Sequence, residues 1–136
     1  MPTVNLLTVL VAAIATMALG FLWYSPTLFG EPWMKLMGFT KESMEKAKKN
    51  MGPMYGLSFV ATLVMALVLA YVVKFVGAMT LAGGLKTGFG MWLGFVGPVQ
   101  MTDVIFGGKS WKLYKINTGY QLVSLVLMGA ILALWG

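Results

Sequence analysis

Four long apolar runs, separated by shorter polar segments, dominate the chain. They cover about residues 4–22, 54–76, 81–106 and 114–135. Each is close to the roughly 20 residues that an α-helix needs to cross a bilayer. The runs lack the alternation of barrel strands, and lipid satisfies no backbone hydrogen bond, so they predict helices. The sequence therefore predicts an all-α polytopic membrane protein, with residues 1–136 forming a single four-transmembrane-helix bundle.

The connection between the first two runs, residues 23–53, is too long to be structureless in a compact protein. Ser25-Pro26 and Glu31-Pro32 interrupt it, because a residue before proline avoids the helical region. Apolar residues around Trp33, interleaved with Lys35, predict a short amphipathic segment at the membrane interface. Thr40 is typical of a helix N-cap, so a further short exposed helix is predicted to follow it.

Lysines are concentrated beside two of the connections. The segment after the first run and the segment after the third hold eight of them: Lys35, Lys41, Lys46, Lys48, Lys49, Lys109, Lys112 and Lys115. The opposite side has only Lys74 and Lys86. The positive-inside rule then places loops 23–53 and 107–113 in the cytoplasm and both termini outside.

The composition supports a membrane location. Hydrophobic residues make up 59% of the 136 residues and charged residues only 10%, where a soluble domain has about a quarter. The net charge is +6, but the chain contains no arginine for bidentate contacts to phosphates or bases. We therefore expect contact with anionic lipid headgroups and no binding of nucleic acid.

The residues that carry most enzyme chemistry are missing. The sequence has no cysteine and no histidine, which excludes disulfides, thiolate nucleophiles, Cys/His zinc sites and histidine relays. Asp103 is the only acidic residue inside a predicted span, so acid–base pairs have almost no candidates. We expect no enzymatic activity, no cofactor and no metal site.

Polar residues on the predicted helices form one candidate site. Gln100 and Asp103 are three apart and share a helix face, and a second polar stripe follows the start of the fourth helix. If the faces converge, they form a polar cavity open to the cytoplasm, and its candidate residues are Gln100, Asp103, Asn117, Gln121, Ser124, Tyr24 and Ser58. The alternative is that they form interhelical hydrogen bonds, worth about 0.6 kcal/mol each. For Asp103 alone, an interfacial position that reaches water or a lysine is favoured.

Small residues recur four apart in three of the helices, a spacing that lets helix backbones approach closely. The candidate packing positions are Ala12, Thr16, Gly20, Gly84, Gly88, Gly90, Gly94, Gly129 and Ala133. Packing within the four helices is the simpler interpretation, and a homodimer is the other. Gly97-Pro98 also predicts a kink in the third helix, because proline removes a helical hydrogen bond.

Several motifs resemble a known family. They are the run from Leu19 to Pro26 (LGFLWYSP) with Leu28-Phe29-Gly30 and Trp33-Met34 after it, and Ile116-Asn117-Thr118-Gly119-Tyr120 in the second half. Together with the glycine-rich apolar stretches, they resemble the bacterial and archaeal membrane proteins grouped as domain of unknown function 1761. The resemblance covers nearly the whole chain and implies four helices in a prokaryotic cytoplasmic (inner) membrane. It implies no settled activity.

Two functions are compatible with these features. The first is a non-enzymatic accessory or scaffold protein that acts through helix–helix or lipid contacts. The alternative is a small-solute or ion transporter or channel that works as a homo-oligomer with a cytoplasm-facing polar cavity. The expected partners are membrane lipids and either a second copy of the chain, as a dimer, or another membrane protein.

Overall fold

A computed structural model describes residues 4–25, 28–38, 42, 51–108 and 110–135. All regular structure in these ranges is helical. The elements are α1 (Leu6–Trp23), α2 (Gly30–Met37), α4 (Met51–Val76), α5 (Leu81–Met91), the π-helical turn η1 (Trp92–Val96), α6 (Gly97–Gly107) and α7 (Trp111–Trp135). Four spans are long and apolar enough to cross a membrane, with α5, η1 and α6 forming the third. The predicted all-α, four-helix class is confirmed.

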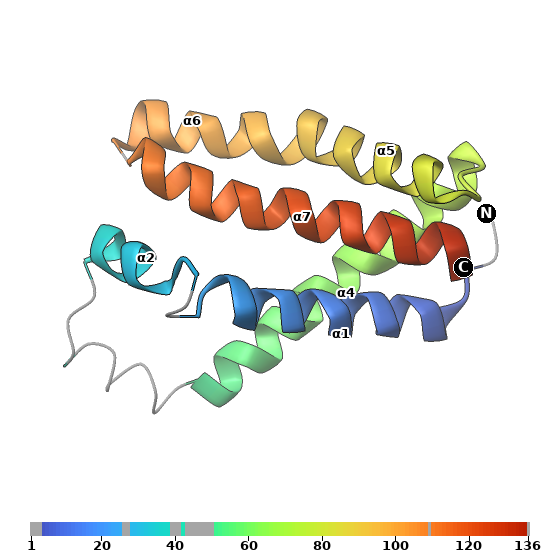
Figure 1. Ribbon diagram of the computed structural model, residues 1–136, viewed down its shortest axis with the longest axis horizontal. Coiled ribbons are helices and arrows are strands. Elements are labelled where there is room, and N and C mark those ends of the chain that lie inside the picture. Colours follow the sequence, from blue (N-terminus) through green and yellow to red (C-terminus); the bar gives the residue numbers. More distant parts are fainter. Residues whose placement is uncertain (1–3, 26–27, 39–41, 43–50, 109, 136) are drawn as a thin grey trace.

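The four spans run side by side and the chain reverses direction at each connection (Figure 1). α7 lies at the centre and packs on α1, α4 and α5. The end of α1, the whole of α2 and the start of α7 lie at one end of the bundle, which we call the lysine-rich end. The two termini lie at the other end, where the Thr8 hydroxyl donates to the Trp135 carbonyl at 3.0 Å.

Side-chain caps explain where two of the helices begin. The Asn5 side-chain oxygen accepts the backbone N–H groups of Leu7 and Thr8 at the start of α1. The Thr80 hydroxyl accepts the N–H of Gly83 at the start of α5. Both caps satisfy donors that the first helical turn leaves without a partner, which matters most at a membrane boundary.

The core is built from small and branched apolar residues. Ala12 and Ala13 on α1, Ala66 on α4 and Met128 on α7 have no exposed surface. The third span contributes little to this core: 11% of its apolar stretch is buried, against 44% for α7. The span of α5, η1 and α6 therefore lies at the edge of the bundle, with most of its surface available to lipid or to another helix.

The predicted small-residue positions divide into two groups. Gly84, Gly88 and Gly129 lie where α5 and α7 touch, and Ala133 faces Gly84 there. The other two glycines of the third span have open space beside them, because a Cβ at Gly90 or Gly94 would meet nothing within 4 Å. On α1, Ala12 and Thr16 are buried in the core, and Gly20 faces the Tyr120 hydroxyl.

The third span changes its hydrogen-bond register just before the predicted proline kink. The Gly97 N–H donates to the Trp92 carbonyl, five residues back, which defines the π-helical turn. Pro98 follows at once and has no N–H to continue the α-helical pattern. At Gly97-Pro98 the α-helical hydrogen bonding is therefore interrupted, and the turn before it, η1, has π-helical spacing instead.

The predicted amphipathic segment between the first two spans is present as α2. It ends at Gly38, whose φ of 75° is the left-handed conformation that glycine adopts most readily. The predicted Thr40 cap and the helix after it lie outside the described residues, apart from Glu42.

Candidate functional site

Hydrogen bonds join the end of α1 to the first turns of α7 at the lysine-rich end. The Trp23 indole N–H donates to the carbonyl of Ile116 at 3.0 Å. The next residue, Tyr24, donates its hydroxyl to the side-chain oxygen of Asn117 at 2.8 Å. The two motifs that resemble the family therefore contact each other directly, although 93 residues separate them in the sequence.

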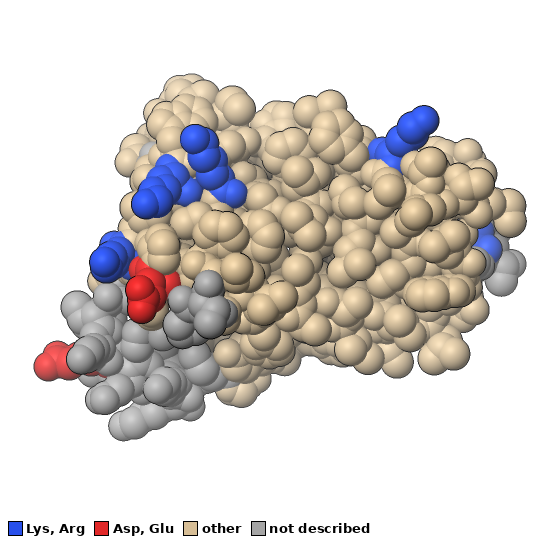
Figure 2. All heavy atoms as spheres, in the orientation of Figure 1, with Lys and Arg blue, Asp and Glu red and all other residues tan. Residues whose placement is uncertain are grey.

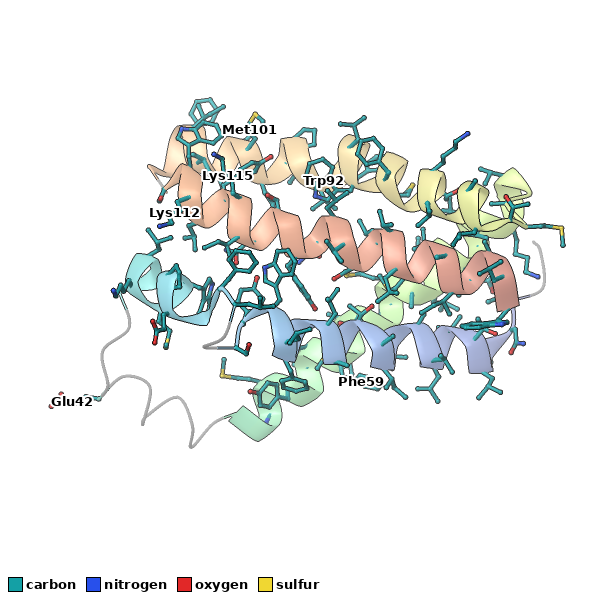
Figure 3. The ribbon with its side chains drawn as sticks, in the orientation of Figure 1. Glu42, Phe59, Trp92, Met101, Lys112 and Lys115 are labelled. Carbon is teal, nitrogen blue, oxygen red and sulfur yellow. The ribbon has the colours of Figure 1, made fainter. Side chains whose placement is uncertain are left out.

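A third aromatic residue completes this connection from the other side of α7. Trp92, in the π-helical turn, points toward α7 (Figure 3) and donates its indole N–H to the Thr118 carbonyl at 2.9 Å. Tyr114 on α7 donates its hydroxyl in return to the Gly97 carbonyl at 3.0 Å. The start of α7 is thus held to the first span and to the third.

Glycine at position 119 allows this approach. A Cβ there would lie 3.3 Å from Cζ2 of Trp23, closer than nearly all such contacts. Tyr120 next to it donates its hydroxyl to the Thr16 carbonyl at 3.2 Å. Trp23 therefore lies against α7 at Gly119, and the Tyr120 ring fills the space beside Gly20.

Five rings form what we call the aromatic cluster. Its ring centroids are separated by 4.8 Å (Trp23–Phe29), 5.2 Å (Tyr24–Trp33), 5.4 Å (Tyr24–Tyr120) and 6.4 Å (Trp23–Tyr120). These are distances at which aromatic pairs attract each other beyond their burial. The aromatic cluster joins α1, α2 and α7 at the position where tryptophan and tyrosine are enriched in membrane proteins.

A tight turn folds α2 back onto this cluster. The N–H groups of Phe29 and Gly30 donate to the carbonyls of Trp23 and Ser25, at 3.1 and 2.9 Å. A Cβ on Gly30 would lie 2.5 Å from the Tyr24 carbonyl oxygen, so only glycine fits. The sequence signal Leu28-Phe29-Gly30 therefore marks the turn that places α2.

Tyr24 lies just past the end of α1 and acts as a hydrogen-bond donor over the whole physiological pH range. Burial, and secondly the nearby Tyr120 phenol, raises the pKa of Tyr24 to about 12. The neutral hydroxyl therefore keeps its bond to Asn117.

A pocket of about 440 Å³ opens beside the aromatic cluster, between α1, α2 and α4. Its lining residues are Met17, Gly20, Phe21, Tyr24, Trp33, Met34, Met54, Tyr55, Ser58 and Tyr120. Most are apolar or aromatic. The volume lies within the roughly 300–1,000 Å³ that is usual for small-molecule sites.

The structure brings only part of the predicted polar set together. Tyr24 and Ser58 line the pocket, whereas Asn117 accepts the Tyr24 hydrogen bond without lining it. Ser124 is fully buried on α7, and Gln121 is half-buried. Gln100 is half-buried and Asp103 is exposed on α6, and neither lines the pocket. Of the seven predicted residues, only Tyr24 and Ser58 line this pocket.

Sequence reasoning missed most of the pocket and two of the residues that hold α7. Met17, Phe21 and Met54 are apolar residues within apolar spans, and no sequence pattern separates them from residues that face lipid. Trp92 and Tyr114 could have been identified from their polar groups, because a buried indole or phenol usually finds a partner.

The charged side chains of the described residues lie toward the ends of the molecule (Figure 2). The view shows several lysines at the lysine-rich end and a wide uncharged surface between the two ends. Lys112 and Lys115 project from the first turns of α7 (Figure 3). This distribution fits a protein whose middle is surrounded by hydrocarbon.

Comparison with known proteins identifies the family. The chain matches the family described as protein of unknown function (DUF1761) over residues 7–133, and it belongs to that family. The comparisons with curated proteins and with solved structures found no match.

Proposed function

We propose that this protein is a non-enzymatic accessory protein of the prokaryotic cytoplasmic membrane, and that it acts through helix–helix or lipid contacts. The observation that carries the proposal is the exposed third span. α5, η1 and α6 pack on α7 along one side, and the large residues Leu93, Phe95 and Val99 are 55%, 68% and 62% exposed. A span with so much free surface suits contact with another membrane component.

The polar groups of the bundle support the same proposal. Trp23, Trp92 and Tyr114 donate hydrogen bonds to backbone carbonyls of neighbouring helices, and Tyr24 donates one to Asn117. Such bonds hold the spans in register. Because these indole and hydroxyl donors already have acceptors within the protein, they do not bind a solute.

The orientation of the chain is part of the proposal. The eight lysines of the lysine-rich connections favour placing that end in the cytoplasm, with both termini outside.

The alternative function is transport of a small solute or ion by a homo-oligomer. The pocket favours it, because it lies at the lysine-rich end and includes Tyr24 and Ser58 from the predicted polar set. Against it, Asp103 and Gln100 do not line that pocket, and four helices enclose little volume.

A photo-crosslinking experiment tests the proposed function. A photoreactive amino acid is placed at Phe95 on the exposed third span, in cells, and at Val64, an exposed residue of α4, as the matched control. We expect Phe95 to capture a discrete second membrane protein that then copurifies in a fixed ratio, or else a restricted set of lipids. Equal, diffuse labelling from both positions would contradict the proposal.

A flux assay separates the two functions. Purified protein in liposomes loaded with ions or small osmolytes should leave the permeability of the liposomes unchanged. A flux that requires the protein would favour the transporter instead.

A further inference from the structure

We propose that the pocket between α1, α2 and α4 binds one acyl chain of an anionic phospholipid, taken from the leaflet at the lysine-rich end. This inference deepens the proposed function, on which it rests, by naming lipid as the contact at one defined site.

The pocket exists because α4 diverges from α1 toward the lysine-rich end. In the second half of α4, Leu69, Ala70 and Val73 are buried in the core, at 1–3% exposure. In its first turns, every side chain from Gly52 to Ser58 is exposed. The ribbon shows the first turns of α4 away from the other spans (Figure 1). Because the first turns of α4 are exposed, lipid reaches the pocket along them.

The lining suits an apolar chain better than a polar solute. The hydroxyls of Tyr24 and Tyr120 are already bonded to Asn117 and to the Thr16 carbonyl, so these residues offer mainly their rings. Phe21 and Tyr55 contact each other across the pocket wall, with centroids 5.2 Å apart. The polar groups that would replace a solute's hydration shell are few.

Three methionines make the lining adaptable. Met17, Met34 and Met54 come from α1, α2 and α4, while α7 contributes Tyr120 to the lining. Methionine is unbranched and polarisable, and it is common on surfaces that accept apolar ligands of varied shape. Acyl chains vary in length and unsaturation, so this lining fits the class of ligand.

The position of α2 indicates where the headgroup of the bound lipid lies. Trp33 and Met34 of α2 line the pocket, and the next residue, Lys35, is exposed. In the sequence, the segments 31–49 and 103–115 hold eight lysines and all four acidic residues, an excess of positive charge. Among the described residues, Lys35, Lys112 and Lys115 are exposed. Anionic headgroups are attracted by about 1 kcal/mol per lysine near a membrane surface. The chain in the pocket therefore belongs to a lipid whose headgroup lies beside α2.

Native mass spectrometry of the full chain tests the proposal. The protein is released from nanodiscs of equimolar phosphatidylethanolamine and phosphatidylglycerol. Ser58→Trp is designed to fill the pocket. Val60→Trp is the matched control, because Val60 does not line the pocket and positions two apart on a helix point about 200° away from each other. We expect the unchanged chain and Val60→Trp to retain one phosphatidylglycerol. Ser58→Trp should retain roughly tenfold less, a difference of about 1.4 kcal/mol in binding.

Charge gives a second measurement. Lys35→Gln should reduce the preference for phosphatidylglycerol over phosphatidylethanolamine about fivefold, the effect of ~1 kcal/mol for one lysine. Lys86→Gln, at the opposite end, should leave it unchanged. If Lys35→Gln and Lys86→Gln showed the same preference for phosphatidylglycerol, the assignment of an anionic headgroup beside α2 would be wrong.

Three results would overturn the inference. The first is equal lipid retention by Ser58→Trp and Val60→Trp. The second is that the unchanged chain forms a lipid-free dimer and Ser58→Trp is a monomer. That result would show that a second copy of the chain, and not a lipid, fills the pocket. The third comes from a photoactivatable phosphatidylglycerol added to the unchanged chain, so that the test does not depend on a variant that folds. The lipid should label Met54 or Tyr55. Labelling confined to the third span would contradict the proposed lipid site.

The inference and the proposed function fail in different ways. If lipid retention does not depend on the pocket while Phe95 still captures a discrete protein, the lipid site is wrong and the accessory function stands. If Phe95 and Val64 label alike and the liposomes show protein-dependent flux, the accessory function is wrong.

Discussion

Gly84 on α5 and Gly129 on α7 bring their two helix backbones into contact. A Cβ on Gly84 would lie 2.4 Å from the Gly129 carbonyl oxygen, and a Cβ on Gly129 would lie 2.3 Å from the Gly84 carbonyl oxygen. Gly88 makes a similar approach to the Leu125 carbonyl, at 2.3 Å. Since no side chain stands between the backbones, van der Waals contact along this line holds the third span to the centre of the bundle.

Gly84→Ala should destabilise the protein. The new methyl group meets backbone that cannot move aside, and overpacking of this kind costs about 1–3 kcal/mol. Gly90→Ala is the matched control, because its Cβ meets open space and alanine is the better helix former by up to about 1 kcal/mol. Reversible unfolding in mixed micelles measures both. Equal stabilities would show that the α5–α7 contact is looser than described.

Tyr24 and Asn117 should be energetically coupled. Tyr24→Phe and Asn117→Ala each remove one partner of the 2.8 Å hydrogen bond that joins α1 to α7. A double-mutant cycle should give a coupling of about 0.6–1.7 kcal/mol, the range for hydrogen bonds between membrane helices. A cycle that pairs Tyr24→Phe with Gln121→Ala, in the same helix, is the control and should give a smaller value. Additivity in both cycles would contradict the bond.

One tyrosine should ionise unusually late in an alkaline titration. Burial raises the pKa of Tyr24 to about 12, so the ultraviolet absorbance should show a final tyrosine step near that pH, and Tyr24→Phe should remove it. The stability that neutral Tyr24 contributes is complete below the unfolded pKa of about 10 and is lost as the pH rises from there toward the folded value. The unchanged chain, titrated in parallel, serves as the control. A final step that survives in Tyr24→Phe would assign it to another residue.

Single cysteines should report the orientation of the chain, because the sequence contains no cysteine of its own. By the lysine distribution, a membrane-impermeant thiol reagent added to intact cells should label Met79→Cys, at an exposed position between α4 and α5, and should spare Lys46→Cys. Permeabilised cells provide the control, in which both positions should react. Labelling of position 46 in intact cells would reverse the proposed topology.

Several features of the fold could be predicted from local sequence. The amphipathic α2 and the interruption at Gly97-Pro98 were predicted, because they depend on residues that are near each other in the chain. The caps at Asn5 and Thr80 are equally local but were not predicted. The candidate site could not be predicted in the same way. The set built around Asp103 and Gln100 assumed that the polar faces of two helices turn inward together, whereas α6 leaves Asp103 exposed.

The sequence by itself determined that the chain forms four membrane-capable helices, where each begins and ends to within a few residues, and to which family it belongs. These features follow from run length and from the need of every backbone group for a partner in lipid. Only the tertiary structure decided that Gly84 and Gly88 pack while Gly90 and Gly94 stay open, that Trp23 reaches Ile116, and that Met17 and Met54 line a pocket. Apolar residues within a span look alike in the sequence, and only the rotation and tilt of each helix against its neighbours separate those that face the core from those that face lipid.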